Sequence, residues 1–130
     1  MIEKLPHEVI EAMLDSLPGE ISFVDKDDKV RYFNKNGKRI FPRPRTIIGR
    51  KVQDCHKPEN VPEVNRILNE LRSGRQIIIE GWADANVRPG HKIYNSYVAV
   101  RDEIGGYLGS LVIAKDMTEL LKVINQGGKK

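Results

Sequence analysis

A stretch rich in proline and glycine in the first half of the chain most constrains its fold. Residues 34–58 contain three prolines and two glycines, at Pro42, Pro44, Pro58, Gly37 and Gly49. Proline lacks the backbone N–H that a helix interior needs, so this stretch cannot form a long helix. We expect short helical turns instead, and the apolar pairs at residues 40–41 and 47–48 would each turn toward a core.

The residues before this stretch predict a helix and then a hairpin. Over residues 6–17, apolar side chains recur at helical spacing, and Pro18-Gly19 ends the pattern. Two short apolar segments follow, Ile21 to Asp25 and Val30 to Phe33, and a turn signal at residues 26–28 separates them. We interpret them as a β-hairpin.

The residues after the stretch open with the clearest helix of the chain. Over residues 60–73, four apolar residues share one face at spacings of three, four and seven: Val64, Ile67, Leu68 and Leu71. Asn60 with Glu63 resembles a capping box, in which each side chain bonds the other's backbone N–H. Gly74 is expected to end this helix in the left-handed conformation.

Three longer strands are predicted next, over residues 75–83, 91–101 and 106–115, and a closing helix follows Asp116. Glu119 stands three residues after Asp116, again as in a capping box. Hairpin-linked strands at both ends favour antiparallel pairing. The predicted fold class is therefore α+β, a five-stranded antiparallel sheet with helices on one face and flanking helices at each terminus.

Composition limits what this chain can be. Its 130 residues suit one domain, with 39% hydrophobic and 31% charged residues. We divide it into an N-terminal flanking helix (1–19), a core (20–116) and a C-terminal exit helix with a flexible tail (117–130). No apolar run approaches the roughly 18 residues that span a bilayer, and residues 1–4 lack the apolar core of a signal peptide. The single cysteine excludes an internal disulfide and a multi-cysteine metal site within one chain. We expect a cytoplasmic protein without a membrane partner.

The formal net charge of +4 is mild for a nucleic-acid-binding protein. The charge is unevenly distributed, however, because seven basic residues and no acidic residue lie between positions 35 and 51: Lys35, Lys38, Arg39, Arg43, Arg45, Arg50 and Lys51. Such a run is most often a solvated surface, and we do not expect a nucleic-acid partner. Binding of a phosphate backbone by residues 35–51 is the alternative, and it predicts strong salt dependence.

Three parts of the sequence together resemble a PAS domain. Residues 23–34 resemble the first PAS hairpin, which ends on an asparagine, and residues 48–52 resemble the apolar-glycine step before the long helix. Residues 97–102 with 106–109 resemble the last hairpin, and Asp116-Met117-Thr118 resembles the D-x-T exit motif. Each motif alone has little specificity, but their order and spacing cover about residues 8–125.

A closer resemblance is to the PAS module found with hemerythrin-like cation-binding domains in archaea and bacteria. It is carried by Phe41-Pro42-Arg43-Pro44, Ile47-Ile48-Gly49-Arg50 and Asp54-Cys55-His56. This chain departs from that pattern where Lys57-Pro58 replaces a proline pair, and from the common PAS pattern where Asp28 replaces a glycine. Neither departure threatens the fold, but the first leaves any metal chemistry of a companion domain unsupported.

The resemblance implies a sensory and dimerisation module with a pocket between the sheet and the helical middle. The exit helix would pass a signal to a downstream domain or partner protein. Apolar side chains from separate segments converge on that region, and we expect them to form the pocket walls. The predicted wall residues are Phe23, Ile40, Phe41, Ile48, Val52, Leu68, Leu71, Trp82, Tyr97 and Leu111. They favour a small apolar or cofactor ligand.

The pair Cys55-His56 is the most chemically reactive feature of the sequence. Two residues are too few for a typical zinc site, whereas haem iron needs only one or two axial ligands. A haem sensor that uses His56 or Cys55 is therefore one hypothesis. The alternative is a buried thiol and a helix-end histidine without a ligand. His7 and His91 are expected to be solvent-exposed or capping residues. The cysteine motif of flavin photosensors, Asn-Cys-Arg-Phe-Leu-Gln, does not surround Cys55, and the cofactor stays unidentified.

The sequence offers no catalytic motif, and we expect no enzymatic activity. It contains no nucleophile elbow, phosphate-binding loop or metalloprotease pair. The closing helix would leave Leu121 and Ile124 partly in water, so we expect a homodimer through the terminal helices. A ligand-free interaction module with a filled core is a further alternative, and it predicts no ligand response in thermal melts.

Overall fold

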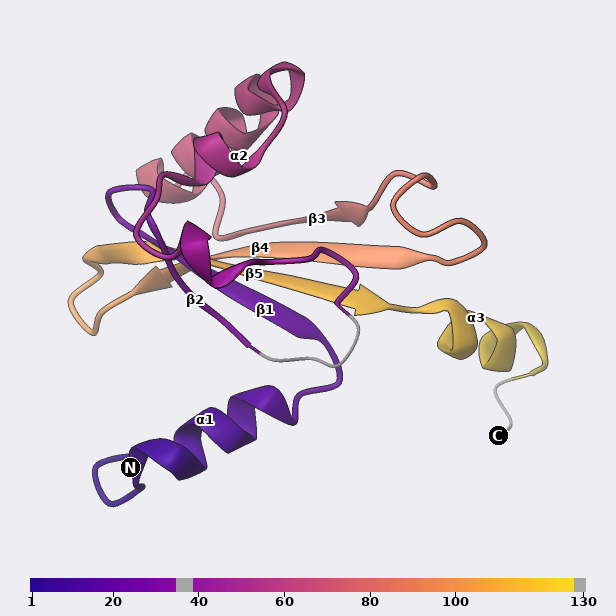
Figure 1. The fold of residues 1–130 in the computed structure, drawn as a ribbon, viewed down its shortest axis with the longest axis horizontal. Coiled ribbons are helices and arrows are strands. Elements are labelled where there is room, and N and C mark those ends of the chain that lie inside the picture. Colours follow the sequence, from indigo (N-terminus) through magenta and orange to yellow (C-terminus); the bar gives the residue numbers. More distant parts are fainter. Residues whose placement is uncertain (35–38, 128–130) are drawn as a thin grey trace.

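The computed structural model describes residues 1–34 and 39–127 (Figure 1). Lys35 and Lys38 of the basic stretch, and residues 128–130 of the predicted tail, lie outside the described residues. The elements are α1 (His7–Asp15), β1 (Glu20–Asp25), β2 (Val30–Phe33), α2 (Val61–Ser73), β3 (Ile78–Trp82), β4 (Ile93–Arg101), β5 (Tyr107–Asp116) and α3 (Thr118–Asn125). Three short 3₁₀ turns precede α2: η1 (Arg45–Ile47), η2 (Val52–Cys55) and η3 (Pro58–Asn60).

The five strands form one antiparallel sheet in the order β2-β1-β5-β4-β3. The predicted fold class is confirmed, and over residues 39–58, the part of the proline- and glycine-rich stretch after residue 34 that the structure describes, short turns form instead of a long helix. Strand β1 pairs with β5, so the N-terminal hairpin and the three C-terminal strands meet in the middle of the sheet.

Side-chain alternation gives the sheet two distinct faces. We call the face that carries Val24, Tyr97 and Val112 the inner face, and the face that carries Phe23 and Leu111 the outer face. Helix α2 and the three short turns lie over the inner face. In Figure 1, α1 lies on the opposite side of the sheet from α2, and α3 extends beyond the end of β5.

The two terminal helices contribute little to the core. Neither α1 nor α3 has a buried residue. A buried cluster of Val24, Val30 and Ile47 instead joins the hairpin to the short turns, with Phe33, Val52 and Cys55 packed against it. Leu68 and Leu71 bury the inner side of α2, as its apolar spacing predicts.

Both predicted capping boxes are wrong. Asn60 does occupy the N-cap of α2, but its side chain makes no capping hydrogen bond. The reason is conformational, because Asn60 closes η3 with φ −94° and ψ −11° rather than the extended backbone of an ordinary N-cap. At α3 the N-cap is Met117, and Asp116 accepts the N–H of Thr118 at 3.0 Å while Glu119 points to solvent beside Lys122. Gly74, in contrast, ends α2 with φ +80° as predicted.

Candidate cavity between the sheet and the helical segment

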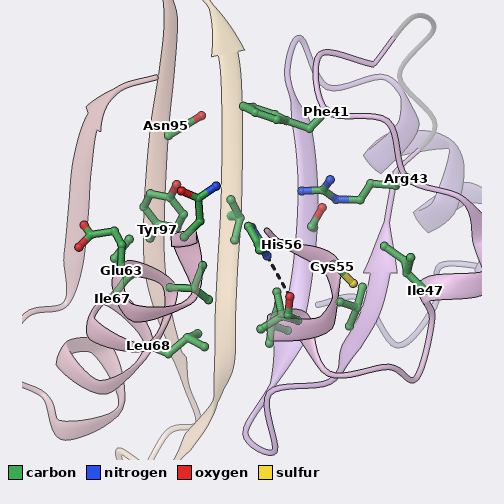
Figure 2. Close-up of a pocket in the computed structure, with 17 residues that line it drawn as sticks. Phe41, Arg43, Ile47, Cys55, His56, Glu63, Ile67, Leu68, Asn95 and Tyr97 are labelled. Atoms are coloured by element: carbon green, nitrogen blue, oxygen red, sulfur yellow. Dashed lines mark hydrogen bonds between the residues drawn. The ribbon is translucent and has the colours of Figure 1, made fainter. Parts of the chain in front are cut away.

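A cavity of about 300 Å³ lies between the inner face of the sheet and the helical segment (Figure 2). Its walls come from the sheet, from residues 41–56 and from residues 60–68. The sheet contributes Ser22, Val24, Val30, Asn95, Tyr97 and Val112. Residues 41–56 contribute Phe41, Arg43, Ile47, Val52, Cys55 and His56, and residues 60–68 contribute Asn60, Glu63, Val64, Ile67 and Leu68. Most of this lining is aliphatic or aromatic, which is typical of ligand pockets.

Four of the ten predicted wall residues line the cavity. They are Phe41, Val52, Leu68 and Tyr97. The predicted ligand pair Cys55 and His56 lines it as well.

Strand alternation turns three of the other predicted residues away from the cavity. Phe23 and Leu111 pair with each other across β1 and β5 on the outer face, next to the inward-facing Val24 and Val112. Trp82 also lies on the outer face, where it is 55% exposed and packs edge-on against Tyr94 with ring centroids 4.9 Å apart.

The remaining three lie near the cavity but not on its surface. Ile48 is 43% exposed because it follows η1 on the solvent side, whereas Ile47 is buried and takes the inward position. Leu71 is fully buried, one turn beyond the lining residue Leu68. Ile40 borders a separate recess of about 140 Å³ beside Gly19 and Asp116.

Glu20 fixes the entry of the helical segment into this site. Glu20 is 4% exposed, and its carboxylate accepts the backbone N–H groups of Ile40 and Phe41, each at 2.7 Å. Arg39 lies 3.9 Å from the same carboxylate and donates to the carbonyl of Phe41 at 3.0 Å. A buried carboxylate needs such partners, and these hold Phe41 at the cavity.

The next part of the wall hydrogen-bonds to the hairpin. The N–H of Gly49 donates to the carbonyl of Val30 at 2.7 Å, and the N–H of Val30 donates to the carbonyl of Arg50 at 2.9 Å. Gly49 has φ +87°, a conformation that side chains disfavour, so glycine suits this step of the chain. Val52 then donates its N–H to the carbonyl of Asp28 at 2.8 Å and enters η2 facing the cavity.

The hairpin turn also contacts α2. Asp28 adopts φ +64°, which explains why glycine is an alternative at this position. Its carboxylate forms an ion pair with Arg72 of α2 and accepts the Gln53 side-chain amide at 3.1 Å. Gln53 also donates to Asn65 at 3.0 Å. The wall of the cavity is therefore connected to both the sheet and α2.

His56 has one ring nitrogen engaged. Its Nδ1 lies 2.9 Å from the carbonyl of Val52, drawn as the dashed line in Figure 2. A carbonyl oxygen can only accept, so Nδ1 carries the hydrogen and Nε2 keeps a lone pair when the ring is neutral. Cys55 makes a long contact to the carbonyl of Lys51 at 3.7 Å. Among residues 1–34 and 39–127, no group of three or more His, Cys, Asp or Glu side chains could hold a metal ion.

The cavity has polar residues that the sequence prediction missed. The Oδ1 atom of Asn95 is buried and has no hydrogen-bond partner. Burial raises the pKa of Tyr97 and Glu63 adds to the shift, whereas the Asn95 amide and Arg43 oppose it. Alternation along β4 could have identified Asn95, because it lies two residues before Tyr97 and must share its face. No pattern in the sequence singles out Arg43 from its basic neighbours.

The carboxylate of Asp116 holds the junction between β5 and α3 in place. Asp116 accepts the N–H of Thr118 at 3.0 Å and the Thr118 hydroxyl at 2.5 Å, and it lies 2.6 Å from Nδ1 of His91. Thr118 in turn accepts the N–H of Lys92 at 2.9 Å. Partial burial opposes the charged form, but these hydrogen bonds outweigh it and lower the pKa of Asp116 to about 2.

None of the helices in the described part of the chain is long and apolar enough to cross a membrane.

Proteins of known structure share this fold. A family model described as a PAS domain matches residues 10–118. The C-terminal domain of a protein from Streptococcus mutans is 32% identical, with a TM-score of 0.83, over 92% of this chain and 90% of that one. The PAS domain of BvgS from Bordetella pertussis is 17% identical, with a TM-score of 0.65, over 92% and 93%. A sensory box sensor histidine kinase from Vibrio cholerae is 14% identical, with a TM-score of 0.59, over 84% and 90%. A search of curated proteins gave no match.

Proposed function

The chain belongs to the PAS domain family, and from this premise we propose that it binds a small molecule in the cavity and passes the binding state to α3. PAS domains are typical of sensory signal-transduction proteins and are generally non-catalytic modules. The cavity of about 300 Å³ is the observation that carries the proposal, because a concave, mostly apolar hollow with a few polar groups is the usual form of a small-molecule site.

The route from cavity to exit helix is short. Val112 lines the cavity and lies on β5, four residues before Asp116. Asp116 and Thr118 hold the start of α3, and Met117 donates its N–H to the carbonyl of Lys92 at 2.7 Å. A ligand that contacts β5 would therefore bias two states of this junction, one with α3 tethered and one with it released.

Binding in the cavity can be tested with indole, a small neutral probe. We expect the amide resonances of cavity residues to shift in two-dimensional NMR spectra when indole is added. Val112→Phe, which fills the cavity, should abolish these shifts. Ile113→Phe is the matched control, because its side chain points to the outer face, and it should leave them unchanged. Indole shifts that are absent, or equal in both variants, would refute binding in the cavity. Native mass spectra and an absorption spectrum of the purified protein would identify any ligand it already holds.

Haem binding through His56 is a second candidate. The free Nε2 lone pair beside the cavity supports it, because an Nδ1–H bond to a backbone carbonyl orients a histidine for metal ligation. The cavity size opposes it, because about 300 Å³ is at the small end for ligand pockets and a porphyrin would need a wider one.

A haem titration separates these cases. If His56 is an axial ligand, His56→Ala should lose the strong absorption band, while His91→Ala, a histidine outside the cavity, should keep it. A band that persists in both His56→Ala and Cys55→Ala would exclude these residues as ligands. The absence of any band in the unaltered protein would exclude haem.

We also propose that two copies of the chain associate through the terminal helices. Both helices leave large apolar side chains exposed, with Met13 56% and Ile124 57% accessible. Pairing of these helices between two copies would remove that surface from water. A downstream signalling domain or partner protein, the cytoplasmic location and the absence of catalysis stay predictions. Cell fractionation checks the location.

The kinship with PAS modules found beside hemerythrin-like domains is likewise a proposal. It rests on residues 41–44, 47–50 and 54–56. Close relatives of this chain that carry the same three segments should be encoded with hemerythrin-like domains. Relatives that carry them without such a domain would contradict it.

A further inference from the structure

We infer that the ligand of the cavity is a small organic acid with an apolar body and a hydrogen-bond donor, whose carboxylate pairs with Arg43. This inference rests on the proposed binding of a small molecule in the cavity and names its chemical class.

The cavity is divided into an apolar and a polar part. In Figure 2, Arg43 and Asn95 lie on either side of Phe41 in the upper part of the view, whereas Ile47, Cys55, Ile67 and Leu68 lie lower, around the cavity. Glu63 lies beside Ile67, but its carboxylate points away from the centre of the cavity. A molecule that fills such a space must be apolar at one end and polar at the other, because buried polar groups need partners.

Arg43 is the cation that sets the polar end. Its guanidinium points from residues 41–44 toward the centre of the cavity (Figure 2) and lies 5.9 Å from the ring centroid of Phe41. Its one hydrogen bond among the described residues goes to the adjacent carbonyl of Pro42 at 3.2 Å, and it forms no ion pair there. An arginine held in this way keeps most of its five donors for a carboxylate, the group whose geometry they match.

The acidic residues near Arg43 already have other partners. Glu20 is occupied by Arg39 and two backbone N–H groups. Glu63 receives two hydrogen bonds from Arg66, at 2.7 and 2.9 Å. The positive charge of Arg43 is therefore not compensated within the cavity. Exposed Arg45 and Arg50 add to the positive potential near this wall, which would attract an anion.

Asn95 sets a second requirement for the ligand, which is a hydrogen-bond donor. Its Oδ1 atom is buried at the cavity with no partner, and an unsatisfied buried acceptor is costly. A carboxylate has no hydrogen to give to it, so the ligand must also carry a donor such as a hydroxyl or amino group.

The test compares three probes of the same apolar body by isothermal titration calorimetry or NMR titration. 3-Phenyllactate carries both a carboxylate and a hydroxyl, 3-phenylpropionate only the carboxylate, and methyl 3-phenyllactate only the hydroxyl. We expect 3-phenyllactate to bind most tightly, and the loss of either group to weaken binding about tenfold, as for a hydrogen bond to a charged or buried group.

Two variants assign the effect to residues. Arg43→Gln should make the acid and its methyl ester bind equally, and Asn95→Leu should remove the advantage of the hydroxyl. Arg45→Gln, one exposed arginine further along, is the matched control and should change neither. Thermal melts establish that all three variants fold.

The outcomes separate this inference from the proposal on which it rests. Binding of indole and of all three probes with equal affinity overturns the organic-acid assignment and leaves ligand binding in place. A preference for the acid that survives Arg43→Gln also overturns the assignment. Failure of indole and of every probe to bind in the cavity overturns both.

Discussion

Asn34 joins three parts of the chain although it is a single polar residue. It is fully buried, accepts the N–H of Ile21 at 2.9 Å, and donates to the carbonyls of Leu14 and Gly19 at 3.0 and 3.2 Å. The end of α1 is thereby connected to the first hairpin. This explains why an asparagine, and not an apolar residue, ends the hairpin.

Asn34→Ala should destabilise the protein by about 2–4 kcal/mol, because several buried backbone groups lose their partner. Urea unfolding followed by circular dichroism measures the change. Asn69→Ala, an exposed asparagine on α2, should change stability by about 0.5 kcal/mol or less. Equal effects of the two substitutions would show that the buried hydrogen bonds of Asn34 contribute nothing measurable.

Asp116 predicts a pH dependence of stability. Its pKa is lowered from 3.8 to about 2, so the folded state holds this proton less tightly than the unfolded chain. A depressed carboxyl pKa stabilises the fold above pH 3.8, and this contribution is lost as the pH falls through about 2. Asp116→Asn should remove up to about 2 kcal/mol at neutral pH and flatten the unfolding free energy over that acid range. An acid dependence identical to that of the unaltered protein would contradict the role of Asp116.

At the residue level, the sequence predicts the cavity only in part. Residue type is visible in a sequence, but the face of a strand is not, so the larger Phe23 and Leu111 were expected where Val24 and Val112 lie. Alternation shows that neighbouring residues of a strand face opposite sides of the sheet, but it does not tell which of the two faces the cavity. Arg43 is hidden among other basic residues, because nothing local distinguishes a cation that points inward from one that points to solvent.

Gly109 determines how β1 and β5 pair. It has φ +153°, and a Cβ atom built there would collide with the backbone oxygen of Val24 and lie 2.7 Å from the ring of Phe23. Gly81 in β3 has nothing within 4 Å of the same position. Two glycines in one sheet therefore have different structural roles.

Gly109→Ala should cost about 1–3 kcal/mol or more, because the strands must separate or the backbone must shift. Gly81→Ala should be close to neutral, since a Cβ atom there meets only open space. Thermal or urea unfolding of the two variants gives the comparison. A Gly109→Ala variant as stable as Gly81→Ala would show that the close approach of β1 to Gly109 has no measurable effect on stability.

Elements were more predictable than their ends. Helix α2 was predictable from the spacing of its apolar residues, because one whole face of the helix is buried or lines the cavity: Val64, Ile67, Leu68 and Leu71. The strands were predictable from β-branched runs between turns. The helix starts were not predictable in detail, because a 3₁₀ turn precedes α2 and changes the backbone of Asn60. Strand β3 begins at Ile78, three residues later than expected, since residues 75–77 connect it to α2.

At the level of the whole molecule, the terminal helices predict a dimer. We expect sedimentation velocity to show a concentration-dependent equilibrium between one and two copies. The pair of substitutions Val9→Glu and Met13→Glu on α1, or Ile124→Glu on α3, should weaken it about tenfold or more, because charge replaces buried apolar surface.

Ile104→Glu is the control for that experiment. Ile104 is 93% exposed in the turn between β4 and β5 and belongs to neither terminal helix, so its substitution should leave the dimer intact. A single copy at all concentrations, or equal weakening by Ile104→Glu, would refute association through α1 and α3.

The hydrogen bonds between Val30 and residues 49–50 have a consequence for aggregation. They occupy part of the free margin of β2, a strand of only four residues. Strand β3, at the other end of the sheet, pairs only with β4. Fibrils that grow by successive strand addition need two open margins on every copy. A copy that docks along β3 can pair with another β3, and the occupied part of β2 leaves less free backbone for a further copy, so we expect edge-to-edge association to favour pairs over filaments.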